Sequence, residues 1–164
     1  MKPVPSAHSS RIPSPAERAY IAVMRAADRI GTRFAQWLKP YGLSPTQYNA
    51  LRILRGAGAD GLPCGDIGER MLTRDSDITR LVDRLEKRKL VTRRRDSADR
   101  RIIRARITPA GLDLVARLDE PLREFHARMF ASLNPDRLRM LQEICDELAV
   151  AANLATDTNT NANA

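Results

Sequence analysis

The sequence predicts a mainly α-helical protein with one small β-hairpin. Helix starts are marked by four pairs in which a capping residue precedes proline, because the capping side chain accepts a free backbone N–H and proline needs no donor at the first helical position. These pairs are Ser14-Pro15, Ser44-Pro45, Thr108-Pro109 and Asn134-Pro135. A short stretch at 103–107 instead alternates apolar and basic residues, which is typical of a strand. At 164 residues and 43% hydrophobic content, the chain is long enough to bury a core.

The first half is expected to contain an arm and three helices. Residues 1–13 hold three prolines and few apolar residues, which indicates a flexible arm. A long helix is expected at 15–38, where apolar residues recur every three or four positions. That apolar stripe is Tyr20, Val23, Ala27, Ile30, Phe34 and Trp37. A second helix at 45–55 is followed by a glycine-containing loop at 57–63 and a short helix at 64–71.

A fourth helix at about 75–88 is followed by the hairpin. Thr73 or Asp75 is expected to cap this helix. Its inward residues are Ile78, Leu81, Val82 and Leu85. Arg80 and Arg84 lie four positions apart and therefore project together on the outward side. The hairpin strands are expected near 90–93 and 103–107, with the tip at 96–101.

Two further helices complete the chain. One begins at Pro109, and its interior Pro121 predicts a kink near Leu118. The other begins after Asn134, and Cys145 falls on its apolar stripe, which predicts a buried structural thiol. The residues from 155 onward are Thr, Asn, Asp and Ala alone, which indicates a disordered tail.

The positive charge is concentrated in one segment. The chain has 28 Lys and Arg against 20 Asp and Glu, a net charge of +8. Residues 70–106 contain 14 of the basic residues and six acidic ones, so the rest of the chain is neutral. Such a local excess favours a surface that binds nucleic acid, whereas a solvated helix face usually alternates its signs. No apolar run approaches the roughly 20 residues that span a bilayer, and no signal peptide is expected at the N-terminus, so we expect a cytoplasmic protein without a membrane partner.

Two short helices, a turn, an arginine-bearing helix and a basic hairpin together predict a winged helix-turn-helix that binds double-stranded DNA. The second helix of such a unit meets base edges in the major groove, and Arg80 can contact guanine bidentately. Arg84 is placed to contact phosphate, and the hairpin arginines can enter the minor groove. The predicted DNA-contacting residues are Arg74, Ser76, Asp77, Thr79, Arg80, Arg84, Asp99, Arg100 and Arg101. A surface ion pair, such as Arg80 with Asp77, is the alternative for each arginine.

Residues 43–111 resemble the multiple-antibiotic-resistance-regulator (MarR) family of bacterial transcription factors. The resemblance is carried by Ile78 to Arg88, Leu90-Val91, Asp96 to Arg101 and Ile107 to Gly111, and it extends over about 15–153. It implies a ligand-responsive homodimer, most often a repressor, on a pseudo-palindromic operator. In the wing, it implies that Asp99 holds the hairpin and that Arg101 enters the minor groove. Lys89, where the family usually has Gly, and Pro121 depart from the pattern.

The resemblance also sets the expected domain organisation. The ranges are an N-terminal arm (1–13), a dimerisation helix (14–42), a winged helix-turn-helix lobe (43–108), C-terminal dimerisation helices (109–153) and a disordered tail (154–164).

A small aromatic or anionic effector is implied by the same resemblance. Five of the seven aromatic residues lie within 20–48, and arginines share their helix, which suits a carboxylate-bearing ring. The candidate effector pocket is Tyr20, Arg25, Arg33, Trp37 and Tyr48. Simple core packing is the alternative for these aromatics.

Other functions are weighed against a specific regulator. A non-specific architectural DNA-binding protein would carry a similar charge. A cysteine-based redox sensor would use Cys64, because a helix N-terminus lowers the pKa of a thiol. We expect no cofactor and no metal site, since His8 and His126 are the only histidines. No enzyme is expected, because the sequence has no phosphate loop, nucleophile elbow or paired carboxylates.

Overall fold

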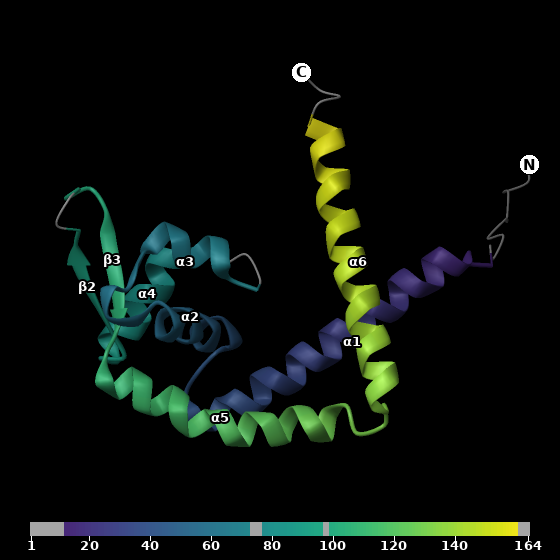
Figure 1. Cartoon of the computed structure of the whole chain (residues 1–164), viewed down its shortest axis with the longest axis horizontal. Coiled ribbons are helices and arrows are strands. Elements are labelled where there is room, and N and C mark those ends of the chain that lie inside the picture. Colours follow the sequence, from purple (N-terminus) through teal and green to yellow (C-terminus); the bar gives the residue numbers. More distant parts are fainter. Residues whose placement is uncertain (1–11, 73–76, 97–98, 161–164) are drawn as a thin grey trace, which may run out of the picture. The chain divides into compact units, whose positions relative to one another are not determined.

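The computed structural model of the chain describes residues 12–72, 77–96 and 99–160, the last eight of them as backbone (Figure 1). The predicted arm lies almost wholly outside this range. The chain divides into two compact units, Met1–Val115 and Ala116–Ala164. The expected mainly helical class with a small antiparallel sheet is confirmed.

The first two helices begin where their caps predict. Helix α1 spans Pro15–Leu38, and Ser14 forms a reciprocal capping box with Glu17. The hydrogen bond from Ser14 lowers the pKa of Glu17. A short 3₁₀ helix, η1 (Lys39–Tyr41), leads into α2 (Pro45–Gly56), where Ser44 and Gln47 form a second capping box. Each box satisfies two backbone N–H groups that the first helical turn leaves without partners.

Helices α2, α3 (Cys64–Arg70) and α4 (Ile78–Lys87) pack against one another around an apolar core. The fully buried side chains include Leu51, Leu54, Ile67, Leu81 and Leu85. The apolar stripe of α4 is therefore covered by α2 and α3, and its opposite face is left to solvent. The cap of α4 is Asp77, whose carboxylate accepts the N–H of Arg80. The predicted caps Thr73 and Asp75 lie outside the described residues.

The sheet has three strands rather than the predicted two. Strands β2 (Val91–Arg95) and β3 (Ile103–Ile107) form the expected antiparallel hairpin, which extends from the helices in Figure 1. A two-residue strand, β1 (Leu62–Pro63), pairs with the other edge of β3, so the order is β1-β3-β2. It lies where a loop was predicted. Two residues carry no readable alternation, which explains the error.

A backbone feature joins α4, β2 and the start of α5 (Pro109–Met129). Lys89 has a positive φ of 59°, so lysine here adopts the left-handed conformation that usually favours glycine. The Leu90 N–H reaches back to the Leu85 carbonyl, and the Thr108 hydroxyl donates to the Lys89 carbonyl. A Cβ on Gly111 would lie 2.4 Å from the Leu90 oxygen, so this close approach requires glycine.

The last helix extends further than predicted, and both final helices leave apolar side chains exposed. Helix α5 continues through Pro121 to Met129. Helix α6 spans Pro135–Thr160, so it continues through 154–160, where the tail was predicted to be disordered, because extending a formed helix costs less than starting one. Cys145 was predicted to be buried, but it is exposed, because its whole stripe on α6 is exposed in the single chain.

Candidate nucleic-acid interface

Helix α4 presents a polar outer face to solvent because its apolar side is buried. Leu81, Val82 and Leu85 are at most 1% exposed, whereas the Arg80 side chain is 80% exposed. The Nε of Arg80 lies 2.9 Å from Oδ2 of Asp77, so the ion pair expected as the alternative is formed. An exposed pair of this kind contributes little, about 0–1 kcal/mol, so it is weak competition for a DNA ligand.

Arg84 lies one turn further along the same face. Its Nε donates to the Arg80 carbonyl at 3.2 Å. Thr79 is exposed beside these arginines, near the helix N-terminus. The outer face of α4 therefore combines a hydroxyl and two guanidinium groups, which are the groups that read base edges and bind phosphates.

The tip of the hairpin is organised by two carboxylates. Oδ1 of Asp99 accepts the N–H of Arg101 at 2.9 Å, and Oδ1 of Asp96 accepts the N–H of Asp99 at 3.2 Å. Two backbone bonds, from Asp96 to Ile102 and from Ile102 to Asp99, close the loop. Arg100 and Arg101 are exposed at this tip. The turn thus holds two arginines outward on a backbone fixed by side chains.

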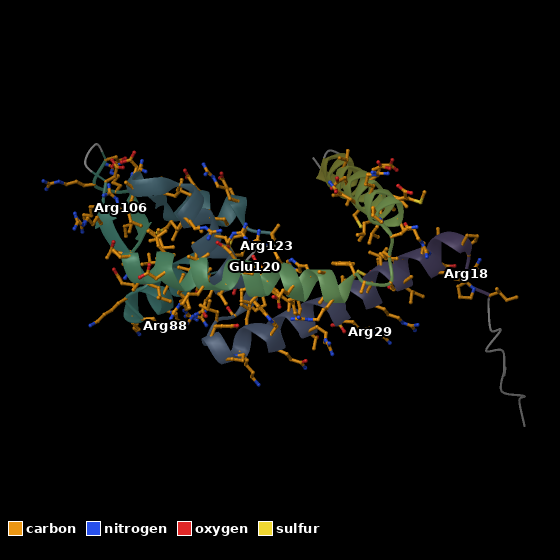
Figure 2. All side chains as sticks on the ribbon, turned by 60° about the horizontal axis from the view of Figure 1, so that its bottom comes forward. Arg18, Arg29, Arg88, Arg106, Glu120 and Arg123 are labelled. Atoms are coloured by element: carbon orange, nitrogen blue, oxygen red, sulfur yellow. The ribbon has the colours of Figure 1, made fainter. Side chains whose placement is uncertain are left out.

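Several basic residues of segment 70–106 form hydrogen bonds or ion pairs within the lobe. Arg104 pairs with Asp96, which raises the pKa of Arg104, and it also donates to the Gly61 carbonyl at 3.3 Å. Arg106 donates to the Asp60 carbonyl at 3.2 Å. Arg88 donates to the Gly42 carbonyl at 2.5 Å; Arg88 and Arg106 are labelled in Figure 2. Arg104 is thus paired with a carboxylate, whereas Arg88 and Arg106 keep their full charge because their partners are carbonyl oxygens.

Arg93 on β2 is also turned inward, toward α4. Its Nε lies 2.7 Å from Oε2 of Glu86, and its Nη1 forms an ion pair with Asp83. The hydrogen bond with Glu86 raises the pKa of the Arg93 guanidinium. Cys64 stands near these charges at the start of α3, and its burial raises the pKa of its thiol. The expected lowering by the helix N-terminus is therefore wrong for Cys64.

The predicted DNA-contacting residues fall on two neighbouring features. Asp77, Thr79, Arg80 and Arg84 lie at the cap and along the outer face of α4, and Asp99, Arg100 and Arg101 lie at the hairpin tip. Arg74 and Ser76 lie outside the described residues. Sequence reasoning missed Asp96, Arg93 and Arg104 as residues that hold the hairpin. The strand register carried a signal for the pair of Arg104 and Asp96. Arg94 stands opposite Arg104, and Asp96, two positions after Arg94, is therefore a diagonal neighbour of Arg104 on the same face.

The predicted effector pocket is only partly assembled. Trp37 and Tyr48 join a cluster with Phe34 and Tyr41, in which the Trp37 and Tyr41 ring centroids are 5.3 Å apart. Tyr20 is 67% exposed and lies 17 positions before Trp37 on the same helix, roughly 25 Å away at 1.5 Å per residue. Tyr20 therefore does not belong to the cluster, and Arg25 and Arg33 are exposed on α1.

Arg52 is the basic residue that the cluster contains instead. Its Nη1 donates to the Tyr48 hydroxyl at 3.1 Å, and its Cζ lies 5.9 Å from the centroid of the Tyr48 ring. The spacing of four between Tyr48 and Arg52 on a helix was the sequence signal for this pair.

The described part of the chain has neither a cluster of metal-ligating side chains nor a membrane-spanning helix. It contains no group of three or more His, Cys, Asp or Glu side chains placed to hold a metal ion. None of its helices combines the length and apolar character needed to cross a bilayer.

Helices α2–α4 followed by the β2–β3 hairpin form the arrangement of a winged helix-turn-helix protein. Residues 41–102 match the family model for the MarR family. A MarR transcription factor structure from Planctomyces limnophilus is 36% identical, with a TM-score of 0.65 over 83% of this chain and 98% of that one. The chain belongs to the MarR family of DNA-binding transcriptional regulators.

Two further relatives agree with this assignment. The HTH-type transcriptional regulator MhqR of Bacillus subtilis is 32% identical over 60% of this chain and 66% of its own length. The MarR family regulator Sco5413 of Streptomyces coelicolor is 27% identical, with a TM-score of 0.75 over 86% of this chain and 97% of that one. The curated relatives are named as transcriptional regulators.

Proposed function

We propose that the protein is a homodimeric repressor that binds a pseudo-palindromic operator in a sequence-specific manner. In each protomer, the outer face of α4 enters the major groove and the hairpin tip enters the adjacent minor groove. The observation that carries this proposal is the separation of the two faces of α4, since Leu81 and Leu85 on its apolar side are at most 1% exposed and Arg80 on its outer side is 80% exposed. A helix with this arrangement is free to lie in a groove.

The dimer is supported by apolar surface on two helices, each considered by itself. On α1, Tyr20, Val23 and Met24 are more than 40% exposed. On α6, Met140 and Ile144 are 61% and 47% exposed. Soluble proteins seldom leave such stripes open to water, and a second copy of the chain supplies a matching apolar surface. Analytical ultracentrifugation should show a dimer at micromolar concentration, and a monomer would contradict this part of the proposal.

Specific recognition is tested against general DNA affinity. The full-length protein is used to select an inverted-repeat site from random-sequence DNA, and binding to that site is compared with binding to a scrambled fragment across a salt series. We expect tighter binding to the selected site at every salt concentration, with a half-site spacing of about 10 base pairs. Equal affinities with equal salt slopes would instead indicate the architectural protein.

Effector binding is proposed at the aromatic cluster of Phe34, Trp37, Tyr41 and Tyr48, with Arg52 as its cationic neighbour. Rings with an adjacent guanidinium suit an aromatic carboxylate. A thermal-shift screen of benzoate and its hydroxylated derivatives tests this, with Arg52→Gln as the comparison variant. A shift that is equal in Arg52→Gln and the unmodified protein would place the effector elsewhere.

A redox mechanism through Cys64 is the less favoured alternative. The thiolate is the reactive form of cysteine, and burial raises the pKa of Cys64.

A further inference from the structure

The two features that carry the proposed DNA contacts are joined by one arginine. Arg93 lies on β2, opposite Ala105 of β3, and its guanidinium reaches across to α4. There it contacts Glu86 through Nε and Asp83 through Nη1. The two carboxylates are three positions apart on α4, so they lie on the same side of the helix.

Glu86 accepts two hydrogen bonds from Arg93, one from its side chain and one from its backbone. One carboxylate oxygen, Oε2, lies 2.7 Å from the Arg93 Nε, and the other, Oε1, accepts the Arg93 backbone N–H at 3.0 Å. The contact therefore fixes the strand itself and not merely the end of a flexible side chain. Because both oxygens of Glu86 are bonded to the same residue, β2 has little freedom to slide or tilt against α4.

The contact is partly shielded from water. The side chains of Arg93, Asp83 and Glu86 are 29%, 38% and 35% exposed, far less than the 80% of Arg80. Charged hydrogen bonds gain strength when water is partly excluded, and one guanidinium that bridges two carboxylates is geometrically selective. Arg93 is thus committed to the interior of the lobe, although it belongs to the basic segment that the sequence assigns to DNA.

We propose that Arg93 is a positioning residue that holds the hairpin at a fixed angle to α4, so that helix and hairpin tip can contact DNA at the same time. The inference rests on the proposed function, in which Arg80 of the helix and Arg101 of the tip both contact the operator. Two contacts on one rigid unit reinforce each other, because once the first is made the second needs no further ordering. When Arg93 is removed, the tip moves independently and its contribution to binding falls.

Arg94 provides a matched control. It is the next residue on β2, it has the same side chain, and successive residues of a strand point to opposite faces. Arg94 is exposed, so Arg94→Gln removes the same charge without touching the contact with α4. A difference between Arg93→Gln and Arg94→Gln therefore separates positioning from simple loss of charge.

The test is a double-mutant cycle with Arg101→Ala, measured as the dissociation constant for the selected inverted-repeat site. In the unmodified protein and in Arg94→Gln, we expect Arg101→Ala to weaken binding by the same factor, about tenfold, because independent sites add. In Arg93→Gln, we expect Arg101→Ala to add less than about twofold, since the tip is already uncoupled. An unchanged factor for Arg101→Ala in Arg93→Gln would overturn the proposal.

A destabilised lobe would weaken binding without this loss of coupling, so the melting temperature of each variant is measured in parallel. Glu86→Gln approaches the same contact from α4 and replaces Arg93→Gln if that variant does not fold. Arg93→Lys keeps the charge but has a single ammonium group, and we expect it to recover only part of the coupling. Full additivity in Glu86→Gln would also overturn the proposal.

Failure of the proposed function gives a different result. If Arg80→Ala and Arg101→Ala both leave binding unchanged in the otherwise unmodified protein, the docking is wrong and the positioning proposal falls with it. If both weaken binding but the cycle is additive, the docking stands and only the role of Arg93 is refuted.

Discussion

Replacing Lys89 with glycine should stabilise the protein. Lys89 has φ 59°, and a non-glycine residue in this left-handed region costs roughly 1–2 kcal/mol. Glycine removes that cost but gains freedom in the unfolded chain, which offsets roughly 0.5–1 kcal/mol. The midpoints of these two ranges give a net gain in the free energy of unfolding of about 0.75 kcal/mol for Lys89→Gly, or about 1.5–3 °C in melting temperature for a chain of this size.

The backbone around Lys89 is held by several bonds, which is why we expect no rearrangement to escape the strain. The Lys89 N–H donates to the Glu86 carbonyl, and the Lys89 carbonyl accepts the Thr108 hydroxyl at 2.8 Å. The control is Lys89→Ala, which removes the long side chain and its charge but keeps the Cβ that causes the strain. Both variants are unfolded thermally and in urea at one protein concentration, because the melting temperature of an oligomer depends on concentration.

The comparison between the two variants decides the matter. Lys89→Gly should be more stable than Lys89→Ala by roughly 1 kcal/mol, since only the glycine relieves the left-handed conformation. A glycine variant that is no more stable than the alanine variant would refute the reasoning, because the positive φ would then carry no cost.

Three other outcomes are expected. Arg80→Ala should weaken binding to the selected site by about 1–3 kcal/mol and Arg101→Ala should weaken it with a smaller sequence effect, as measured by fluorescence anisotropy; unchanged affinity in both would contradict the docking. Gly111→Ala should lower the free energy of unfolding by about 1–3 kcal/mol, because its Cβ would lie 2.4 Å from the Leu90 oxygen. Gly65→Ala is the control for urea unfolding and should cause no such loss, because its Cβ would have no heavy atom within 4 Å. In a Cys145→Ser variant, Cys64 should react more slowly with a disulfide reagent at pH 8 in the folded protein than in urea, because burial raises the pKa of Cys64. Equal rates in the folded and unfolded protein would argue for an accessible thiolate.

Features with a local sequence signal were predicted well. The capping pairs placed the starts of α1 and α2 at Pro15 and Pro45, because a cap and its proline act within one helical turn. The alternation of apolar and basic residues located β3, because side chains on a strand with one solvent-exposed face alternate every two residues.

Features that depend on long-range contacts were not predicted. Strand β1 exists because Leu62 pairs with Ala105, 43 positions away, and two residues have no periodicity of their own. Arg93 and Arg104 were counted with the DNA-binding charge because their carboxylate partners become visible only when the chain is folded. A charge count in sequence therefore overstates the basic surface wherever arginines brace a hairpin.

The order of the sheet has a consequence for how copies of the protein meet one another. Strand β2 lies at an edge, so one side of its backbone has no strand beside it in the described residues. An open edge can template cross-chain pairing and thereby aggregation, and charged residues on such an edge discourage it. Strand β2 carries three consecutive arginines, of which Arg94 and Arg95 are exposed, so two such edges repel each other. The basic charge that suits the hairpin to a polyanion therefore also disfavours pairing of two copies of the chain along the open edge of β2.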